Sequence, residues 1–300
     1  MIVIGLDGFE PSIVKSMLEA GELPSLAKLR AQGGFSTVAT TNPAQTPVAW
    51  STFATGVNPG AHGIFDFLRR DAGTYLPDIG LNRYEQKNAF LPPKVVNLRR
   101  GVPVWQRLTE AGVGSTVVRC PCAYPPDPLK GRLLSGLGVP DIRGGFGSAT
   151  YYTSDAGATP RESENLVLVR PDGATASTYL IGPRHPKTRA DCRVEVSLRI
   201  DPSENIVTLR SEGAPQELVI RQGEWSNWLR VKFKLGMLQS ALGMLRFYLV
   251  RTEPELGLYA SPVNFDPEAP VFPISSPPSY AGELLEQLGQ KAAAAAHVDV

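Results

Sequence analysis

The apolar residues change their spacing near residue 160, and this change limits the folds open to the chain. Up to about residue 150, segments with helical spacing alternate with short apolar runs, an order typical of a mostly parallel sheet covered by helices. From Ser163 to about Ile220, apolar and polar residues alternate with period two between turn residues, which indicates antiparallel strands with one solvent-exposed face. We therefore expect an α/β fold, a mostly parallel sheet flanked by helices, with an inserted antiparallel β subdomain.

The same patterns predict where the parts begin and end. Residues 1–160 should form the N-terminal part of the α/β core, residues 161–255 the inserted β-rich subdomain, and residues 256–300 a return to the core with a frayed tail. The helices expected in the core span residues 11–18, 24–30, 47–55 and 104–112, and the strands span residues 1–6, 35–40, 115–119 and 133–141 with its glycine turn.

The first of these strands carries an acid at its end. Residues 2–4 are Ile-Val-Ile, a short apolar run typical of a strand buried on both faces, and Gly5-Leu6-Asp7-Gly8 ends it. Asp7 should therefore lie at the carboxyl edge of the sheet, where the ligands of open α/β sheets collect.

A hydroxyl side chain is expected at the start of a later helix. Thr46 and Pro47 are typical of an N-cap followed by proline at the first helical position, and the helix should end at Gly56. A helix N-terminus stabilises an alkoxide or a phosphoryl group. Asp7 and Thr46 could meet on one metal ion, which is the chemistry of a metal-activated hydroxyl nucleophile.

The segment after that helix makes the pattern specific. Residues 55–64 read Thr-Gly-Val-Asn-Pro-Gly-Ala-His-Gly-Ile. Together with Asp7 and Thr46, this segment resembles the alkaline phosphatase superfamily, in particular its type I nucleotide pyrophosphatase/phosphodiesterase-like members. The resemblance implies an alkaline phosphatase-like core, Thr46 as the nucleophile, and Asp7 and Thr46 as ligands of one of two divalent ions, zinc by the resemblance. It also makes His62 structural.

The chain departs from the pattern of this superfamily at two places. Members that act on nucleotides often carry Asn three residues after the nucleophile, and here that residue is Ala49. The further Asp and His ligands of the superfamily have no counterpart, because the three histidines, at positions 62, 185 and 297, do not fit its spacing. The sequence therefore resembles the front part of a larger enzyme, with an incomplete core and poor metal binding by itself.

Composition predicts the kind of partner. The net charge is +1, so neither a nucleic-acid polymer nor a membrane surface is expected as the main partner. The resemblance implies a small-molecule phosphoester as the substrate. No segment is apolar enough to span a bilayer or serve as a signal peptide, so a cytoplasmic location is expected. Three cysteines cannot all pair within the chain, and buried thiols are expected.

Three classes of function compete. The first is a metal-dependent phosphoester hydrolase with a Thr nucleophile, truncated in this chain. The alternative is an inactive remnant or an anion-binding fragment that lacks the second half of the metal site. An unrelated phosphotransfer enzyme fits worse, because Phe9 stands where an aspartate-nucleophile phosphatase needs a second Asp and no P-loop is present. Asp141 follows a glycine-rich turn, where a turn role is favoured over a place at the active-site rim. The pattern identifies no substrate-binding residue and no oligomeric state.

Overall fold

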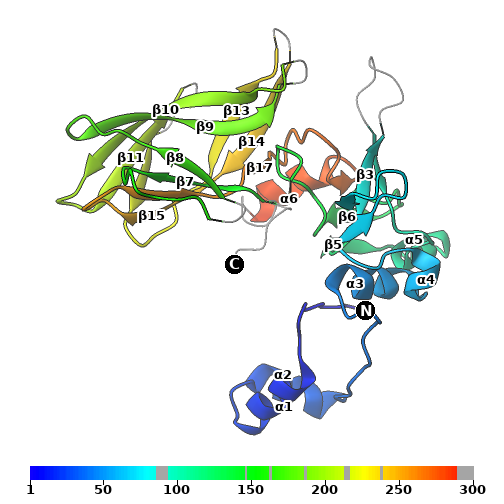
Figure 1. Ribbon diagram of the computed structural model, residues 1–300. Helices are drawn as coiled ribbons and strands as arrows, with labels where there is room; N and C mark the ends of the chain where they lie inside the picture. Colours follow the sequence, from blue (N-terminus) through cyan, green and yellow to red (C-terminus); the bar gives the residue numbers. More distant parts are fainter. Residues whose placement is uncertain are drawn as a thin grey trace. The chain divides into compact units, whose positions relative to one another are not determined.

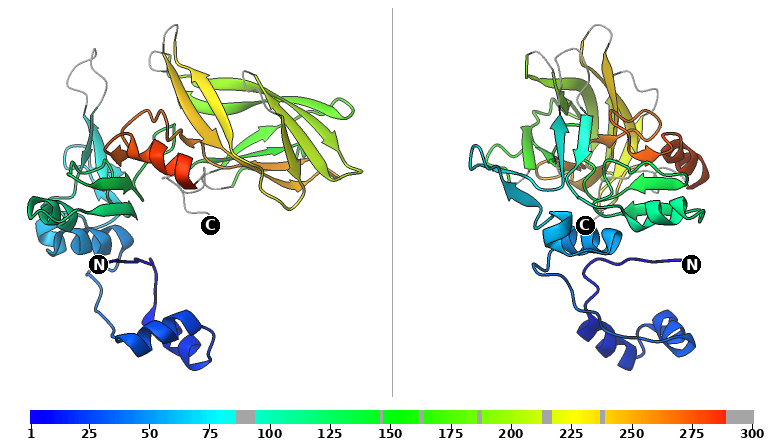
Figure 2. Two further views of the ribbon diagram at one scale, coloured as in Figure 1. Left: turned by 180° about the vertical axis from the view of Figure 1, so that it is seen from behind. Right: turned by 90° about the vertical axis from the view of Figure 1, so that its right-hand side faces the viewer.

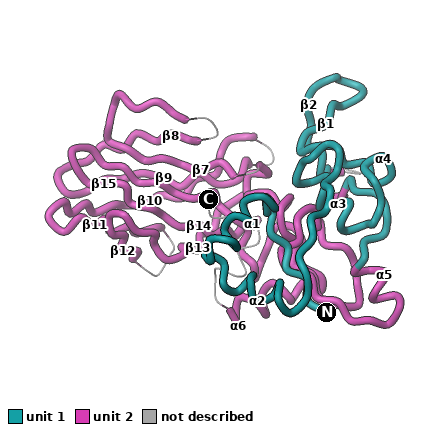
Figure 3. Tube along the Cα trace, turned by 90° about the horizontal axis from the view of Figure 1, so that it is seen from below, with its two compact units in different colours: residues 1–83, 98–104 teal, residues 84–97, 105–300 magenta. Residues whose placement is uncertain are grey.

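The protein is described here by a computed structural model that covers residues 1–85, 94–145, 147–161, 164–185, 188–212, 217–236 and 239–288. The chain falls into two compact units (Figure 3). Unit 1 contains residues 1–83 and 98–104, and unit 2 contains residues 84–97 and 105–300. The boundaries expected at residues 160 and 255 concern a core and an insertion rather than these units, and they stay a prediction.

Unit 1 is mainly helical (Figure 1). Its elements are α1 (Pro11–Glu19), α2 (Pro24–Gln32), α3 (Thr46–Thr55), α4 (Pro59–His62) and the antiparallel pair β1 (Leu68–Arg70) and β2 (Pro77–Ile79). All four helices start with proline in the first turn, where the missing N–H costs nothing. In α1, the side chain of Glu10 caps the N-terminus, and Val14 and Leu18 are buried on one face. Local signals therefore account for the helices.

Two expected strands of unit 1 do not form. Residues 1–6 and 35–40 have no regular secondary structure, so the predictions of strands there were wrong. Ile2 and Ile4 are 89% and 81% exposed, although their apolar run is typical of a strand buried on both faces. The physical reason is that a strand is stabilised by pairing and packing, and neither segment pairs with another strand in the described part of the chain.

Unit 2 contains one small sheet with parallel pairing and a helix on each side of it in the sequence. The strands β5 (Thr116–Cys120) and β6 (Arg132–Ser135) are parallel, and β18 (Ser275–Ser276) adds antiparallel to β6. Helix α5 (Val104–Glu110) precedes this sheet and α6 (Tyr280–Leu288) follows it. The strands β3 (Asn82–Glu85) and β4 (Lys94–Asn97) form a separate pair. The helix expected over residues 104–112 and the strand expected over residues 115–119 are confirmed, and the strand expected over residues 133–141 forms only at its start.

The rest of unit 2 is antiparallel for the most part, in three sheets (Figure 2). The first has the order β12-β11-β10-β9 (Leu218–Arg221, Ile206–Ser211, Asp191–Asp201, Thr175–Arg184), the second β13-β14-β17 (Leu229–Lys234, Ser240–Leu245, Asn264–Phe265), and the third β15-β16-β7-β8 (Phe247–Arg251, Gly257–Ala260, Ala149–Thr153, Glu164–Leu168). The expected strands after residue 163 are confirmed, and those of the β12-β11-β10-β9 sheet pair antiparallel as expected, whereas β8 pairs in parallel with β7. The expectation of a mostly parallel sheet is not, because antiparallel pairs predominate among the described strands.

One hydrophobic core joins these sheets. Strand β10 buries every second residue, and the buried row Val194, Val196, Leu198 and Ile200 packs into a cluster to which the other sheets and α6 contribute. Glycine is required at residue 182, since a Cβ there would overlap the buried ring of Phe233. The longest helix that the structure describes has ten residues, and none of the described helices could cross a membrane.

Candidate functional site

Asp7 contacts the first turn of α3 through both carboxylate oxygens. Thr46 Oγ1 donates to Asp7 Oδ2 at 3.0 Å, and Trp50 Nε1 donates to Asp7 Oδ1 at 2.9 Å. Residues 46 and 50 are four apart and therefore lie on one face of the helix. Two ligands of one metal ion have their oxygens roughly 3 to 4 Å apart. The predicted approach of Asp7 and Thr46 is confirmed. The placement of Asp7 at the carboxyl edge of a sheet was wrong, because the segment before it forms no strand.

The position of Thr46 in the helix differs from the prediction. The N-cap is Gln45, which makes no side-chain cap, and Thr46 is the first residue of α3. The carbonyl of Gln45 accepts from the main-chain N–H groups of Val48 and Ala49. Because a Thr at the N-cap would direct its oxygen toward these N–H groups, the shift of one position explains why the hydroxyl of Thr46 reaches Asp7 instead.

Two features allow Asp7 and the residues before it to lie close to α3. A Cβ at Gly5 would overlap the indole ring of Trp50, so only glycine allows this close approach. The carboxylate of Asp7 lies at the N-terminus of α3, where the helix dipole favours negative charge. Sequence analysis missed Trp50, although its place four residues after Thr46 was a usable signal. The site thus combines an exposed carboxylate with a half-buried hydroxyl.

The segment after α3 turns through a second short helix. The helix α3 ends at Gly56, which adopts the left-handed conformation at φ 71°, and Asn58 then caps α4 by accepting from the N–H of Ala61. Gly63 ends α4 at φ 77°, and a Cβ on it would lie 2.8 Å from Nε of Arg100. These residue types are therefore explained by backbone conformation and close packing.

His62 lies at the centre of this turn and is fully buried. The N–H of Ile64 donates to Nδ1 at 3.1 Å, so the ring proton resides on Nε2, which lies 2.9 Å from Thr52 Oγ1. Burial lowers the pKa of His62, and the charges of Arg99 and Arg100 lower it further. Both ring nitrogens have protein partners, which is the arrangement of a neutral structural histidine.

The described residues do not fit a complete metal site. Asp7 and Thr46 offer oxygen donors, whereas zinc at a catalytic site takes three protein ligands and a water. In the part of the chain that the structure describes, no three His, Cys, Asp or Glu side chains gather closely enough to hold an ion. Of the other two histidines, His185 lies in a loop after β9 and His297 lies outside the described residues.

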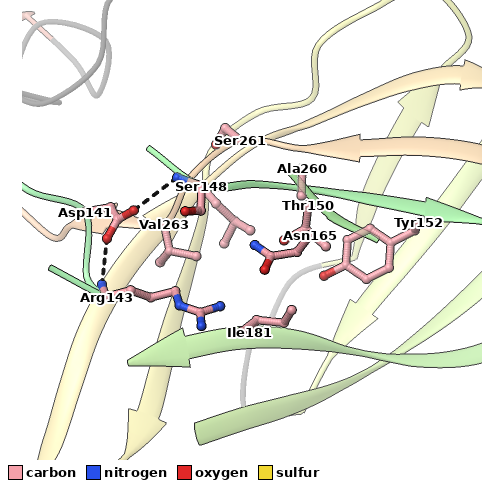
Figure 4. A pocket seen from close by; sticks show the side chains of 11 residues that line it. Asp141, Arg143, Ser148, Thr150, Tyr152, Asn165, Ile181, Ala260, Ser261 and Val263 are labelled. Carbon is pink, nitrogen blue, oxygen red and sulfur yellow. Dashed lines mark hydrogen bonds between the residues drawn. The ribbon is translucent and has the colours of Figure 1, made fainter. Parts of the chain in front are cut away.

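Asp141 is a structural residue of a loop in unit 2. It is 2% exposed, and its carboxylate accepts from four main-chain N–H groups, those of Arg143, Gly145, Gly147 and Ser148. Figure 4 shows this carboxylate beside a small polar cavity. The cavity has a volume of about 10 Å³, enough for one water molecule but not for a substrate. The favoured turn role of Asp141 agrees with this geometry.

A comparison with protein families identifies one match. The model of the family described as type I phosphodiesterase / nucleotide pyrophosphatase matches residues 1–175 of the 300 residues, which is more than half of the chain. The matched segment includes Asp7, Thr46 and the turn around His62. No curated protein and no solved structure matches the chain.

Proposed function

Because the chain belongs to the type I phosphodiesterase/nucleotide pyrophosphatase family, we propose that it carries the nucleophile of a phosphoester hydrolase, the hydroxyl of Thr46. The observation that supports this proposal is the 3.0 Å hydrogen bond from Thr46 Oγ1 to Asp7 Oδ2 at the N-terminus of α3. The carboxylate orients the hydroxyl, and the helix dipole lowers the cost of negative charge on its oxygen.

The chemistry follows from these two side chains. As the proton of Thr46 Oγ1 passes to solvent, the oxygen forms a bond to phosphorus, and the bond from phosphorus to the leaving oxygen breaks, with that oxygen taking up a proton from solvent. Water then hydrolyses the phosphothreonine ester and restores the hydroxyl. Trp50 donates to the second oxygen of Asp7 and so keeps the carboxylate turned toward Thr46. Trp50 is therefore a positioning residue in this proposal.

Members of the family are in general metal-dependent. We propose that Asp7 and Thr46 are ligands of one of two divalent ions, zinc being the expected metal. The expected substrate is a small phosphoester. Ala49 has no side-chain amide that could contact a phosphoryl oxygen, so we expect a phosphodiester rather than a nucleotide as the substrate. We further propose that the chain is a truncated hydrolase with weak activity, because Asp7 and Thr46 are only two of the ligands that a two-metal site needs.

One observation favours a second candidate, a non-catalytic protein. Both oxygens of Asp7 already accept hydrogen bonds from α3, and two such bonds suffice to attach the N-terminal segment to the helix. In that case Thr46 is only one end of a structural link, and the helix N-terminus at most binds an anion.

The test is the hydrolysis of a p-nitrophenyl phosphodiester by the purified chain with zinc, manganese or magnesium added. Thr46→Val keeps the branched shape but removes the hydroxyl, and Thr46→Ser keeps the hydroxyl. We expect weak turnover by the wild type, at least tenfold less by Thr46→Val, and retained turnover by Thr46→Ser. Trp50→Phe removes a donor to Asp7 without touching Thr46, and we expect it to reduce turnover less than Thr46→Val does.

Two results would contradict the proposal. Equal turnover by wild type and Thr46→Val would exclude Thr46 as the nucleophile. Turnover no faster than buffer with every metal would support the non-catalytic candidate. Zinc calorimetry on the same preparation addresses the metal set, because tight binding of two ions would mean that the chain contains ligands beyond Asp7 and Thr46.

A further inference from the structure

The solvent-facing side of the sheet formed by β9, β10 and β11 contains a broad polar hollow of about 690 Å³. This volume lies within the usual range for small-molecule sites. The alternating burial of these strands points the apolar side chains into the core and the polar ones outward. The polar residues at the hollow are small hydroxyl residues, three arginines and two acidic residues.

The register of the strands explains why a hollow forms. Arg199 on β10 lies between Thr175 on β9 and Thr208 on β11. Two residues earlier on β10, Ser197 lies between a serine on β9 and Arg210 on β11. Short hydroxyl side chains therefore form the floor, and Thr208 is 6% exposed beneath its neighbours.

The arginines around this floor provide positive charge. Arg199 and Arg210 occupy diagonal positions on neighbouring strands, about 7 to 8 Å apart at Cα, so both guanidinium groups can reach one small ligand. Arg170, which follows β8, is the third arginine of the hollow. Arg210 forms an ion pair with Glu217. Arg170 and Arg199 have no ion pair within the described residues, although the charge of Arg199 also acts on the nearby Asp201. Both guanidinium groups can therefore still contact a ligand.

An acidic residue of the hollow narrows the class of ligand. Two acidic residues line the hollow together with the floor hydroxyls: Glu217, which is paired with Arg210, and Asp172. A simple anion would gain nothing from Asp172, whereas a sugar hydroxyl can donate to it. Guanidinium groups bind tetrahedral oxyanions through paired hydrogen bonds. We propose that this hollow is a binding site for a sugar or polyol that carries a phosphate or sulfate group.

This site lies wholly within unit 2 and does not depend on the role of Thr46. The test is calorimetric titration of the full chain at low salt with glucose 6-phosphate, glucose 6-sulfate, glucose and inorganic phosphate. We expect saturable binding of at least one of the two sugar esters and weaker binding of glucose and of phosphate. The preferred ester identifies the natural oxyanion. High salt should weaken the binding, because exposed charges are screened.

Variants locate the site. Arg199→Ala and Arg170→Ala should each weaken binding about tenfold, the loss expected for one charge-assisted contact. Ser177→Phe should also weaken it, because it fills the floor without changing charge. The matched control is Arg221→Ala on β12, which removes the same charge from the same sheet but does not line the hollow. Circular dichroism verifies that each variant is folded.

Three outcomes would overturn the proposal. The first is the absence of saturable binding of either sugar ester. The second is binding of glucose as tight as that of its esters, since the arginines would then contribute nothing. The third is binding that Arg199→Ala and Arg170→Ala leave unchanged or that Arg221→Ala reduces equally, which would place the ligand elsewhere.

Discussion

Lowering the pH below about 6.5 should destabilise unit 1 through one side chain, His62. Burial is the main cause of the lowered pKa of this residue, and Arg99 and Arg100 add to it. Protonation would add a hydrogen to Nδ1, which in the neutral ring carries none and accepts a hydrogen bond from the N–H of Ile64. It would thus break a buried hydrogen bond and add a positive charge near two arginines.

The sign and size of the effect follow from proton linkage. Since the pKa of His62 is lower in the folded chain, the folded state binds fewer protons than the unfolded state, and stability rises with pH in that window. The contribution is complete above about pH 6.5 and is lost as the pH falls toward the lower pKa of the folded state. Within this window, the free energy of unfolding should fall by up to about 1.4 kcal/mol for each pH unit.

The measurement is urea unfolding between pH 7.5 and 5 with His62→Gln, whose amide can still donate and accept. Other groups also titrate in this range, so the matched control is His185→Gln, the same substitution in a loop of unit 2. As the pH falls, His62→Gln should lose less stability than the wild type and His185→Gln. If the curves of the two variants stay parallel across this range, the linkage argument is wrong.

Two further predictions concern the loops. Gly63→Ala should reduce the free energy of unfolding by about 1 to 3 kcal/mol, because residue 63 has φ 77° and its Cβ would press on Arg100; urea unfolding tests this, with Gly60→Ala as the milder control. Asp141→Asn should lower the thermal midpoint and cost about 1 to 3 kcal/mol, because an amide cannot accept from all four N–H groups of the loop. The control is Asp155→Asn, whose carboxylate accepts one N–H, and an equal loss in both variants would refute this reading of Asp141.

The helices of unit 1 could be predicted because their signals are local. Proline at the first turn and glycine at the end set the bounds of α3 to within one residue, from Thr46 to Gly56. The same reasoning placed the N-cap at Thr46, whereas the N-cap is Gln45 and Thr46 is the first residue of the helix. That error matters, because the neighbouring position decides whether the hydroxyl serves the helix or Asp7.

The lack of strands at residues 1–6 and 35–40 could not be predicted from the sequence of these segments. Their apolar pattern is compatible with a buried strand, but pairing depends on which other segment lies beside them. The antiparallel strands of unit 2 could be predicted because each pairs with a strand that is near it in the sequence, as β10 does with β11. The register that places Arg199 between Thr175 and Thr208, and with it the polar hollow, was beyond sequence analysis for the same reason.

The two candidate functions differ in one physical respect at Asp7, namely whether the proton of Thr46 stays on its oxygen. In both of them Trp50 holds Oδ1 of Asp7 and thereby fixes the direction of the carboxylate. In the structural reading, the proton of Thr46 stays on Oγ1 and its bond to Oδ2 is permanent. In the catalytic reading, that proton must leave, and the negative charges of Asp7 and the Thr46 oxygen then lie about 3 Å apart. Such a pair repels unless a positive charge joins it. The helix dipole alone supplies about half a charge, so the catalytic reading requires a cation at this position and the structural reading does not.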